Sequence, residues 1–314
     1  MQRLWRRGRV WRHRPRLHHF LSLGPSGFHR VAYTEWGNPR RADAVVCVHG
    51  LTRNSRDFDA LAASLADRRR VVCMDVAGRG ASDWLERKED YSFALYQADA
   101  AALLARVTAP APGRAARVDW VGTSMGGLIG MLLAAQPNSP IRRLVLNDVG
   151  PLVPWLALAR LKGHAPAGAQ RFADLDEVEA YLRRACASFG PLEDHHWRHL
   201  ASHGAQLNDD GSYRLAFDPE AVSVLRRSAA QGLPLGPAWH LGIDLWRVWD
   251  AIRCPVLVLR GGESDLLPDS IAREMQVRGP GARVVEFPGV GHAPWLMSDD
   301  QVDVVQRFLL ERDG

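Results

Sequence analysis

The sequence predicts an α/β protein built on one largely parallel sheet, and three observations carry this prediction. Short apolar runs alternate with helix-length amphipathic stretches along the 314 residues, an order that gives a sheet covered by helices on both faces. The runs at 45–48, 71–74 and 256–259 are apolar throughout, as in strands buried on both faces of a parallel sheet. The alternation stops between about 150 and 250, which indicates an insertion on top of the sheet.

The elements expected in the core can be placed from these patterns. We expect strands at 29–36, 44–48, 70–75, 118–122, 141–148, 255–260 and 282–287, and helices at 58–67, 94–107, 127–136 and 301–311. In the interruption, helical patterns recur at 175–187 and 194–203 among several prolines. The sequence therefore predicts a core at 17–149 and 250–314 and a helical cap at 150–249.

Charge is distributed unevenly along the chain. Residues 1–16 hold seven arginines and no acid, and the remaining 33 basic and 35 acidic side chains give the body a net charge of −2. We expect 1–16 to be a disordered basic tail, with contact to anionic lipid or nucleic acid and an organelle presequence as alternatives. For the folded body no nucleic-acid partner is expected.

Composition also bears on compartment. No apolar run approaches the roughly 18–20 residues of a membrane span, so no stable membrane insertion is expected. The basic segment lacks the apolar stretch of a secretory signal. Four scattered cysteines show no Cys-x-x-Cys spacing, which speaks against a zinc site or redox pair and suits reduced thiols in a cytoplasm.

A nucleophile motif lies between a predicted strand and a predicted helix. Gly122-Thr123-Ser124-Met125-Gly126 follows the strand at 118–122 and precedes the helix at 127–136, which is the setting that a Gly-x-Ser-x-Gly elbow requires. The strained turn raises the serine hydroxyl above the sheet, and the glycines let helix and strand pass closely. We predict that Ser124 is a nucleophile; a Gly-rich turn with a bystander serine is the alternative reading.

Serine needs a base that is held by a third group. His292, on a Gly- and Pro-rich loop after the last predicted strand, is the expected base. Asp265, after the strand at 255–260, is the expected acid, because it precedes His292 by 27 residues. Two alternatives stay open for the acid: Glu263 on the same loop, and Asp148 at the end of the neighbouring strand.

An oxyanion hole needs two backbone donors. The amide of Met125, the residue after the nucleophile, is one candidate. The second is expected on the loop after the strand at 44–48, where His49-Gly50-Leu51-Thr52 places the Leu51 amide.

Together these residues resemble the α/β-hydrolase superfamily, in particular its capped carboxylesterase and lactonase-like branch. The resemblance covers nearly all of 24–314 and rests on the His49-Gly50-Leu51 loop, the elbow, and motifs including Asp75-Val76-Ala77-Gly78-Arg79-Gly80 and Asn147-Asp148-Val149-Gly150-Pro151. It implies an eight-stranded, mostly parallel sheet with helices on both faces and a helical cap after strand six. It also implies the chain order of nucleophile, acid and histidine.

Three further features of the sequence each have a structural and a functional interpretation. Gly78-Arg79-Gly80 lacks the third glycine of a dinucleotide loop. His195, His199 and His203 have i,i+4 spacing that can hold a metal, but no His-Glu-x-x-His pattern is present, and a solvated helix face is the favoured reading. Trp295, three residues after His292, is a candidate for lining the substrate pocket, with core packing as the alternative. We expect no cofactor and no metal.

The predicted activity is hydrolysis of a small or medium carboxylic ester, thioester or lactone through an acyl-enzyme. A ligand receptor on a hydrolase scaffold, and a carbon–carbon hydrolase or acyltransferase with the same triad, are the alternatives. The sequence predicts a small-molecule acyl substrate as partner, admitted under the cap.

Overall fold

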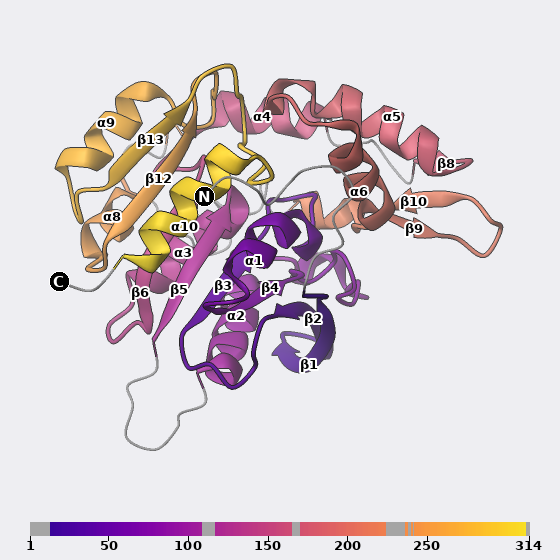
Figure 1. Cartoon of the computed structure of the whole chain (residues 1–314), viewed down its shortest axis with the longest axis horizontal. Helices are drawn as coiled ribbons and strands as arrows, with labels where there is room; N and C mark the ends of the chain where they lie inside the picture. The colour runs from indigo at the N-terminus through magenta and orange to yellow at the C-terminus, as the bar shows by residue number, and fades with distance from the viewer. Residues whose placement is uncertain are drawn as a thin grey trace.

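A computed structural model describes residues 13–108, 117–164, 170–223, 236–237, 240 and 242–311. Its centre is an eight-stranded sheet (Figure 1) with the order β1-β2-β4-β3-β5-β6-β12-β13. β1 and β2 are antiparallel, β2 pairs antiparallel with β4, and all later pairs are parallel. The strands of the sheet are β1 (Arg16–Gly24), β2 (Gly27–Trp36), β3 (Ala44–Val48), β4 (Arg70–Met74), β5 (Val118–Thr123), β6 (Ile141–Asn147), β12 (Val256–Gly261) and β13 (Arg283–Phe287).

Helices cover both faces of this sheet, as the alternation of patterns predicts. One apolar core lies under α2 (Phe93–Val107), α3 (Met125–Ala134), α8 (Trp246–Ala251) and α9 (Asp269–Val277). The second core lies under α1 (Asp59–Leu65) and α10 (Asp299–Leu310). Every residue of β3 and of β12 is buried, which explains the uninterrupted apolar runs at 45–48 and 256–259 within these strands. The predicted fold class is confirmed.

The N-terminal strand β1 was not expected, and it corrects the predicted tail. Arg16 is the first residue of β1, and its guanidinium donates to the Gly37 carbonyl at 3.0 Å. The prediction of a disordered tail at 1–16 is therefore wrong for Arg16. Residues 1–12 of the predicted tail lie outside the described residues. β1 is an edge strand whose leucines Leu17, Leu21 and Leu23 are largely exposed, so it lacks the buried pattern by which the other strands can be recognised.

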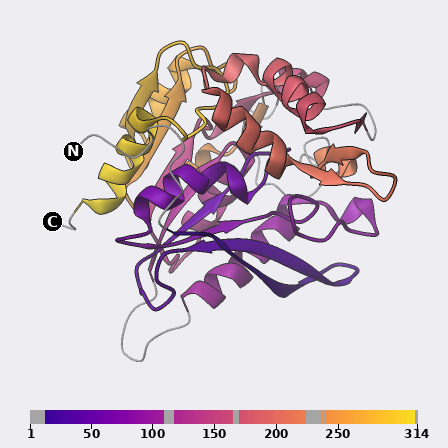
Figure 2. The ribbon, with the colours of Figure 1, turned by 45° about the vertical axis from the view of Figure 1, so that its right-hand side comes forward.

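The insertion between β6 and β12 contains strands as well as helices. Both views place α4, α5 and α6 together above the sheet (Figures 1 and 2). Its described elements are β7 (Leu152–Pro154), α4 (Trp155–His164), β8 (Arg171–Phe172), α5 (Leu175–Ala185), η3 (Ala187–Phe189), α6 (Asp194–Gly204), β9 (Ala205–Leu207), β10 (Tyr213–Leu215), η4 (Pro219–Ser223) and β11 (Gly242–Asp244). β8, β10 and β9 form a small antiparallel sheet, and β11 pairs with β7. The limits of the cap at 150 and 249 stay a prediction; α8, which straddles the second limit, packs against the core helix α3.

Local sequence sets the ends of several helices. Asp174 caps α5 by accepting a hydrogen bond from the Glu177 amide at 2.9 Å, and Glu177 accepts in return from the Ala173 amide at 2.8 Å. Two short 3₁₀ helices, η1 (Ser55–Phe58) and η2 (Lys88–Asp90), lie in the loops after β3 and β4. Among the described helices, none combines the length and the apolar character that crossing a membrane requires.

Candidate active site

The turn between β5 and α3 has the geometry of a nucleophile elbow. Ser124 occupies it with φ 51° and ψ −114°, a conformation that few side chains tolerate. The two glycines of the motif are required by space. A Cβ on Gly122 would lie 2.3 Å from the Gly126 carbonyl oxygen, and a Cβ on Gly126 would lie 2.0 Å from that of Val48. The helix can therefore approach the sheet closely only because both positions lack a side chain.

The close contact at Gly126 predicts how an added methyl group there would affect the stability of the fold. Gly126→Ala is expected to destabilise the fold by about 3 kcal/mol or more, because its Cβ meets backbone rather than a movable side chain. Gly50→Ala is the control, since a Cβ there meets only ordinary contacts at 3.7 Å and beyond. Urea unfolding of both variants measures the difference; similar midpoints would contradict the close approach at Gly126.

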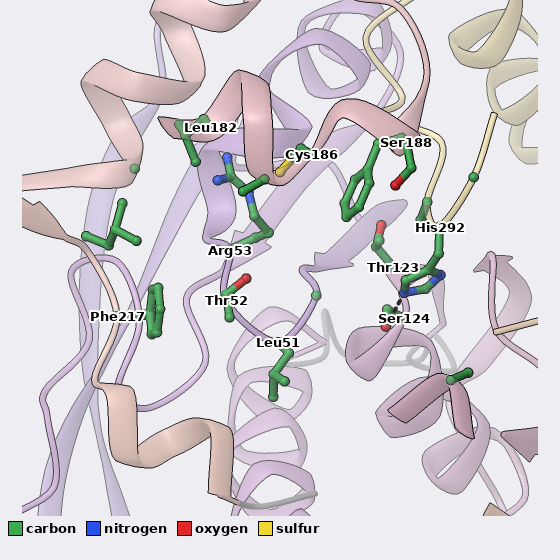
Figure 3. A pocket seen from close by; sticks show the side chains of 18 of the residues that line it. Leu51, Thr52, Arg53, Thr123, Ser124, Leu182, Cys186, Ser188, Phe217 and His292 are labelled. Carbon is green, nitrogen blue, oxygen red and sulfur yellow. Dashed lines mark hydrogen bonds between the residues drawn. The ribbon is translucent and has the colours of Figure 1, made fainter. Parts of the chain in front are cut away.

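Ser124 and His292 lie within hydrogen-bond distance, as the sequence predicts. The His292 Nε2 atom is 2.9 Å from the Ser124 hydroxyl oxygen, and Figure 3 shows the imidazole directly beside the serine. His292 stands on the loop after β13. The Asn147 side-chain amide donates to the Pro294 carbonyl of this loop at 2.7 Å, which ties it to the end of β6.

The carboxylate behind His292 is that of Asp148, so the prediction of Asp265 in this place is wrong. The His292 Nδ1 atom lies 2.7 Å from Asp148 Oδ2, and the Gly261 amide donates to Asp148 Oδ1 at 2.8 Å. Asp148 is fully buried and has a φ of 56°. Glu263, the other acid weighed on the Asp265 loop, does not take this place either.

Strand register explains why Asp148 reaches the histidine. Asn147, the last residue of β6, pairs with Thr123, the residue before the nucleophile. Asp148 follows β6 and Ser124 follows β5. The acid therefore lies level with the serine, at the end of the neighbouring strand. Asp265 stands four positions past the end of β12 and lines a cavity with Glu263 instead. The usable signal in the sequence is that Asp148 follows its strand directly, whereas Asp265 does not.

The loop after β3 brings the Leu51 amide near the nucleophile. A Cβ on Gly50 would lie 3.7 Å from the Ser124 Cβ, and Leu51 lines the same cavity as Ser124. Met125 is the first residue of α3, where helix amides have no partner within the helix. The two predicted oxyanion donors thus flank Ser124, and their role as donors stays a prediction.

Two buried side chains, His49 and Arg79, hold this loop in place, a role that no local pattern in the sequence predicted for them. The His49 Nε2 atom accepts from the Val76 amide at 3.0 Å, and Nδ1 lies 2.7 Å from the Gly50 carbonyl oxygen. Burial lowers the pKa of His49 to about 3, so the ring is neutral and Nδ1 donates. Arg79 is also fully buried; its Nε donates to the Leu51 carbonyl at 2.9 Å, and Nη2 lies 3.8 Å from the Met125 sulfur.

A cavity of about 290 Å³ opens above Ser124. Its floor consists of strand-end loops and its roof of cap residues, as the close view shows (Figure 3). The cap side is largely apolar and comes from α4, α5, η3 and the segment after α6: Ala157, Tyr181, Leu182, Ala185, Cys186, Ser188, Phe189, Gly204, Leu215 and Phe217. The Gly291 amide donates to the Ser188 carbonyl at 2.7 Å, which joins the cap to the loop that carries His292.

Trp295 does not take the place predicted for it on the cavity wall. Its indole packs 5.2 Å from the ring of Phe189 and 5.8 Å from that of Trp197, measured between centroids. Phe189 lines the cavity, and Trp295 lies behind it. The indole is 7% exposed, so packing, the alternative reading, describes Trp295.

The histidines of α6 are not a solvated face, which corrects that reading. His196 is buried and His199 and His203 are half-buried, while His195 is exposed. Asp59, His199 and His203 place one ligand atom each within 4.8 Å of one another. The Arg56 guanidinium occupies this cluster, with Nε 2.8 Å from Asp59 Oδ2 and Nη1 3.3 Å from His203 Nδ1. Burial lowers the pKa of His203 to about 3, and the arginine supplies the positive charge that a metal would bring.

Comparison with known proteins gives this geometry a family. The sequence model of the alpha/beta hydrolase family matches residues 45–307. A 3-hydroxybutyrate-oligomer hydrolase from Cupriavidus necator is 42% identical over 297 residues, which cover 94% of this chain and 97% of that protein. A 2-(acetamidomethylene)succinate hydrolase from Mesorhizobium japonicum is 30% identical over 244 residues, 78% of this chain and 79% of that protein.

Solved structures show the same likeness. The crystal structure of an alpha/beta hydrolase from Novosphingobium aromaticivorans superposes with a TM-score of 0.78 at 32% identity, and the match covers 94% of this chain and 98% of that chain. Both the core and the inserted segment therefore have counterparts in proteins of known structure.

Proposed function

Because the chain belongs to the alpha/beta hydrolase family, we propose that it is a serine esterase that cleaves short esters of 3-hydroxy acids at Ser124. The observation that carries the chemistry is the pair of hydrogen bonds that links Ser124, His292 and Asp148, at 2.9 and 2.7 Å. This arrangement supplies a nucleophile, a base and a buried anion in the order that acyl transfer needs.

Acylation follows from these contacts. The Ser124 oxygen attacks the ester carbonyl while His292 Nε2 takes the hydroxyl proton. Asp148 holds Nδ1 as the donor and stabilises the imidazolium that forms. The amides of Leu51 and Met125 hold the oxyanion of the tetrahedral intermediate. When the intermediate collapses, the carbon–oxygen bond to the alcohol breaks and His292 returns its proton to the leaving oxygen.

Deacylation repeats the sequence with water as the nucleophile. His292 removes a proton from the water, the hydroxide attacks the acyl carbonyl, and the proton goes back to Ser124 as the free acid leaves. The apolar roof of the cavity lowers the local dielectric during both steps, which strengthens the pull of the oxyanion donors.

The substrate class rests on the relative and on the cavity. A 3-hydroxybutyrate-oligomer hydrolase matches this chain over nearly the whole length of both proteins. A cavity of about 290 Å³ suits a chain of a few small hydroxy-acid units rather than a folded protein. Its mostly apolar cap side suits the methyl-bearing backbone of such a chain.

The cysteines support a reducing compartment, and we include a cytoplasmic location in the proposal. Cys47 and Cys73 are register partners on the neighbouring strands β3 and β4, and both are free and buried. Cys186 and Cys254 are free as well. Adjacent unpaired thiols are typical of proteins kept reduced.

The test is direct hydrolysis of defined oligomers. The full chain is incubated with the dimer and trimer of 3-hydroxybutyrate, and monomer release is followed by chromatography, with p-nitrophenyl butyrate as a general ester. Cleavage of dimer and trimer that Ser124→Ala abolishes is the expected result. Hydrolysis of the p-nitrophenyl ester without any cleavage of the oligomers would keep the esterase and overturn the substrate, and no turnover of either would favour a receptor.

A further inference from the structure

Charged residues on the cavity wall lie on opposite sides of the nucleophile. Arg53 stands on the loop after β3, whereas Glu263 and Asp265 stand on the loop after β12. In the sheet order β3-β5-β6-β12, these loops leave strand ends that are three positions apart, with the strand of Ser124 between them. At about 4.8 Å per strand, the separation is roughly 14 Å. The cavity wall therefore carries a guanidinium on one side of Ser124 and two carboxylates on the other.

The Arg53 guanidinium is held in position by two of its nitrogens, which leaves the third nitrogen, Nη1, available as a donor. Its Nε and Nη2 donate to Asp57 Oδ2 and Oδ1 at 2.8 and 2.7 Å, a side-on ion pair that fixes its plane. The carbon of the guanidinium lies 5.6 Å from the centre of the Trp295 ring. Nη1 has no hydrogen-bond partner within the described part of the chain. A Cβ on Gly204 would still be 3.7 Å from Nη1, so the glycine leaves space beside it.

The surroundings of Arg53 favour an anion from outside the chain. Figure 3 shows its side chain directed toward Leu182 and Cys186 of the cap. Among the described cap residues that line the cavity there is no acid, and burial raises the pKa of the Cys186 thiol to about 11, which keeps it neutral. The Arg53 side chain is 13% exposed. An anion bound at Nη1 would be largely shielded from water, where charge-assisted hydrogen bonds are strong.

We propose that Arg53 is the receptor for the free carboxylate of the substrate, so that the cavity selects anionic hydroxy-acid esters over neutral esters of the same length. A linear hydroxy-acid ester has a hydroxyl at one end and a carboxylate at the other. The carboxylate lies at Arg53 and the hydroxyl end points toward Glu263 and Asp265, whose carboxylates repel an anion and accept hydrogen bonds. The polarity of the cavity thus sets the direction in which the ester crosses Ser124. This inference rests on the proposed function for the identity of the cleaved bond.

The test compares one substrate in a charged and a neutral form. The 3-hydroxybutyrate dimer and its primary amide differ only at the carboxyl end, and the ratio of their kcat/KM values is the readout. Wild type is expected to favour the acid about 10- to 100-fold, the range for hydrogen bonds to charged groups. Arg53→Gln should remove most of this preference, and Arg53→Gln with Asp57→Asn should do the same without leaving Asp57 unpaired.

Arg56→Gln is the matched control. Arg56 lies three residues away and is also paired with an acid, Asp59 through Oδ2, but it is not among the residues that line the cavity; its loss should leave the ratio unchanged. A purely structural role of Arg53 lowers both kcat/KM values together and keeps the ratio, which would overturn the inference. So would a wild-type ratio near one.

A binding measurement separates this inference from the proposed function. Calorimetry with the Ser124→Ala protein and the intact dimer should give a Kd about 10- to 100-fold weaker when Arg53→Gln is added. If wild type fails to cleave the dimer but this difference is found, the proposed reaction fails and the carboxylate site stands. If cleavage occurs and the difference is absent, the carboxylate site fails and the reaction stands.

Discussion

Ser124→Ala is expected to lower kcat for ester hydrolysis by about five to six orders of magnitude, on the scale seen when a triad nucleophile is removed. The Ser124 hydroxyl oxygen is 2.9 Å from the His292 Nε2 atom, and alanine leaves that base with no proton to take. The variant should fold, because the positive φ at this position is set by the elbow and not by the hydroxyl. Steady-state kinetics with an activated ester measures the loss.

Covalent labelling gives an independent reading of the same prediction. A fluorophosphonate probe should label wild type once and leave Ser124→Ala unlabelled. Ser188→Ala is the control, because Ser188 lines the same cavity from the cap side and contacts the Gly291 amide only through its backbone carbonyl. Labelling that persists in Ser124→Ala, or disappears in Ser188→Ala, would place the nucleophile elsewhere.

Asp148→Asn should cost about four orders of magnitude in kcat. The asparagine amide would donate to His292 Nδ1, which then becomes an acceptor, so that Nε2 carries the proton and cannot act as base. The side-chain oxygen can still accept from the Gly261 amide, which preserves the local fold. Single-turnover acylation isolates this effect from product release.

Asp265→Asn is the comparison for that experiment. The carboxylate at His292 Nδ1 is that of Asp148, and Asp265 lines the cavity, so Asp265→Asn is expected to weaken substrate binding more than it slows acylation at saturating substrate. A larger fall in the acylation rate for Asp265→Asn than for Asp148→Asn would show that Asp265 moves into the triad during turnover.

The sequence predicts most strands of the sheet well, because a buried parallel strand appears in the sequence as a short continuous run of apolar residues. Ala44–Val48 is found with the predicted bounds, and the other six predicted strands differ by two residues or fewer at either end. β1 escapes because an edge strand with exposed leucines shows no buried run. No bounds were predicted for α4, α8 and α9; α8, with six residues, is too short for a helical period to show.

The residues of the candidate site also differ in how far local sequence predicts them. Ser124 and His292 carry a motif and a chain position, and the structure brings them together. The choice between Asp148 and Asp265 depends on how β5 and β6 align, and the local indication, that Asp148 follows its strand directly, does not state that alignment. Sequence separation favoured Asp265, but register across β5 and β6 decides for Asp148. The roles of Arg53 and Arg79 could not be predicted from the sequence, because they depend on loops distant in sequence that come together around the cavity.

The position of the inserted segment has a consequence for chain entropy. β6 and β12 pair directly, Asn147 with Leu259, although more than a hundred residues separate them. The entropy of closing such a loop grows only with the logarithm of its length, so doubling it costs about 0.6 kcal/mol. Lengthening the insertion at an exposed loop is therefore expected to change the stability of the sheet little, whereas its buried residues pack in the same apolar core as the sheet. Because contacts between distant residues form late, we expect the β6–β12 contact to follow the pairing of β5 with β6, so that Ser124 and Asp148 meet before His292 joins them.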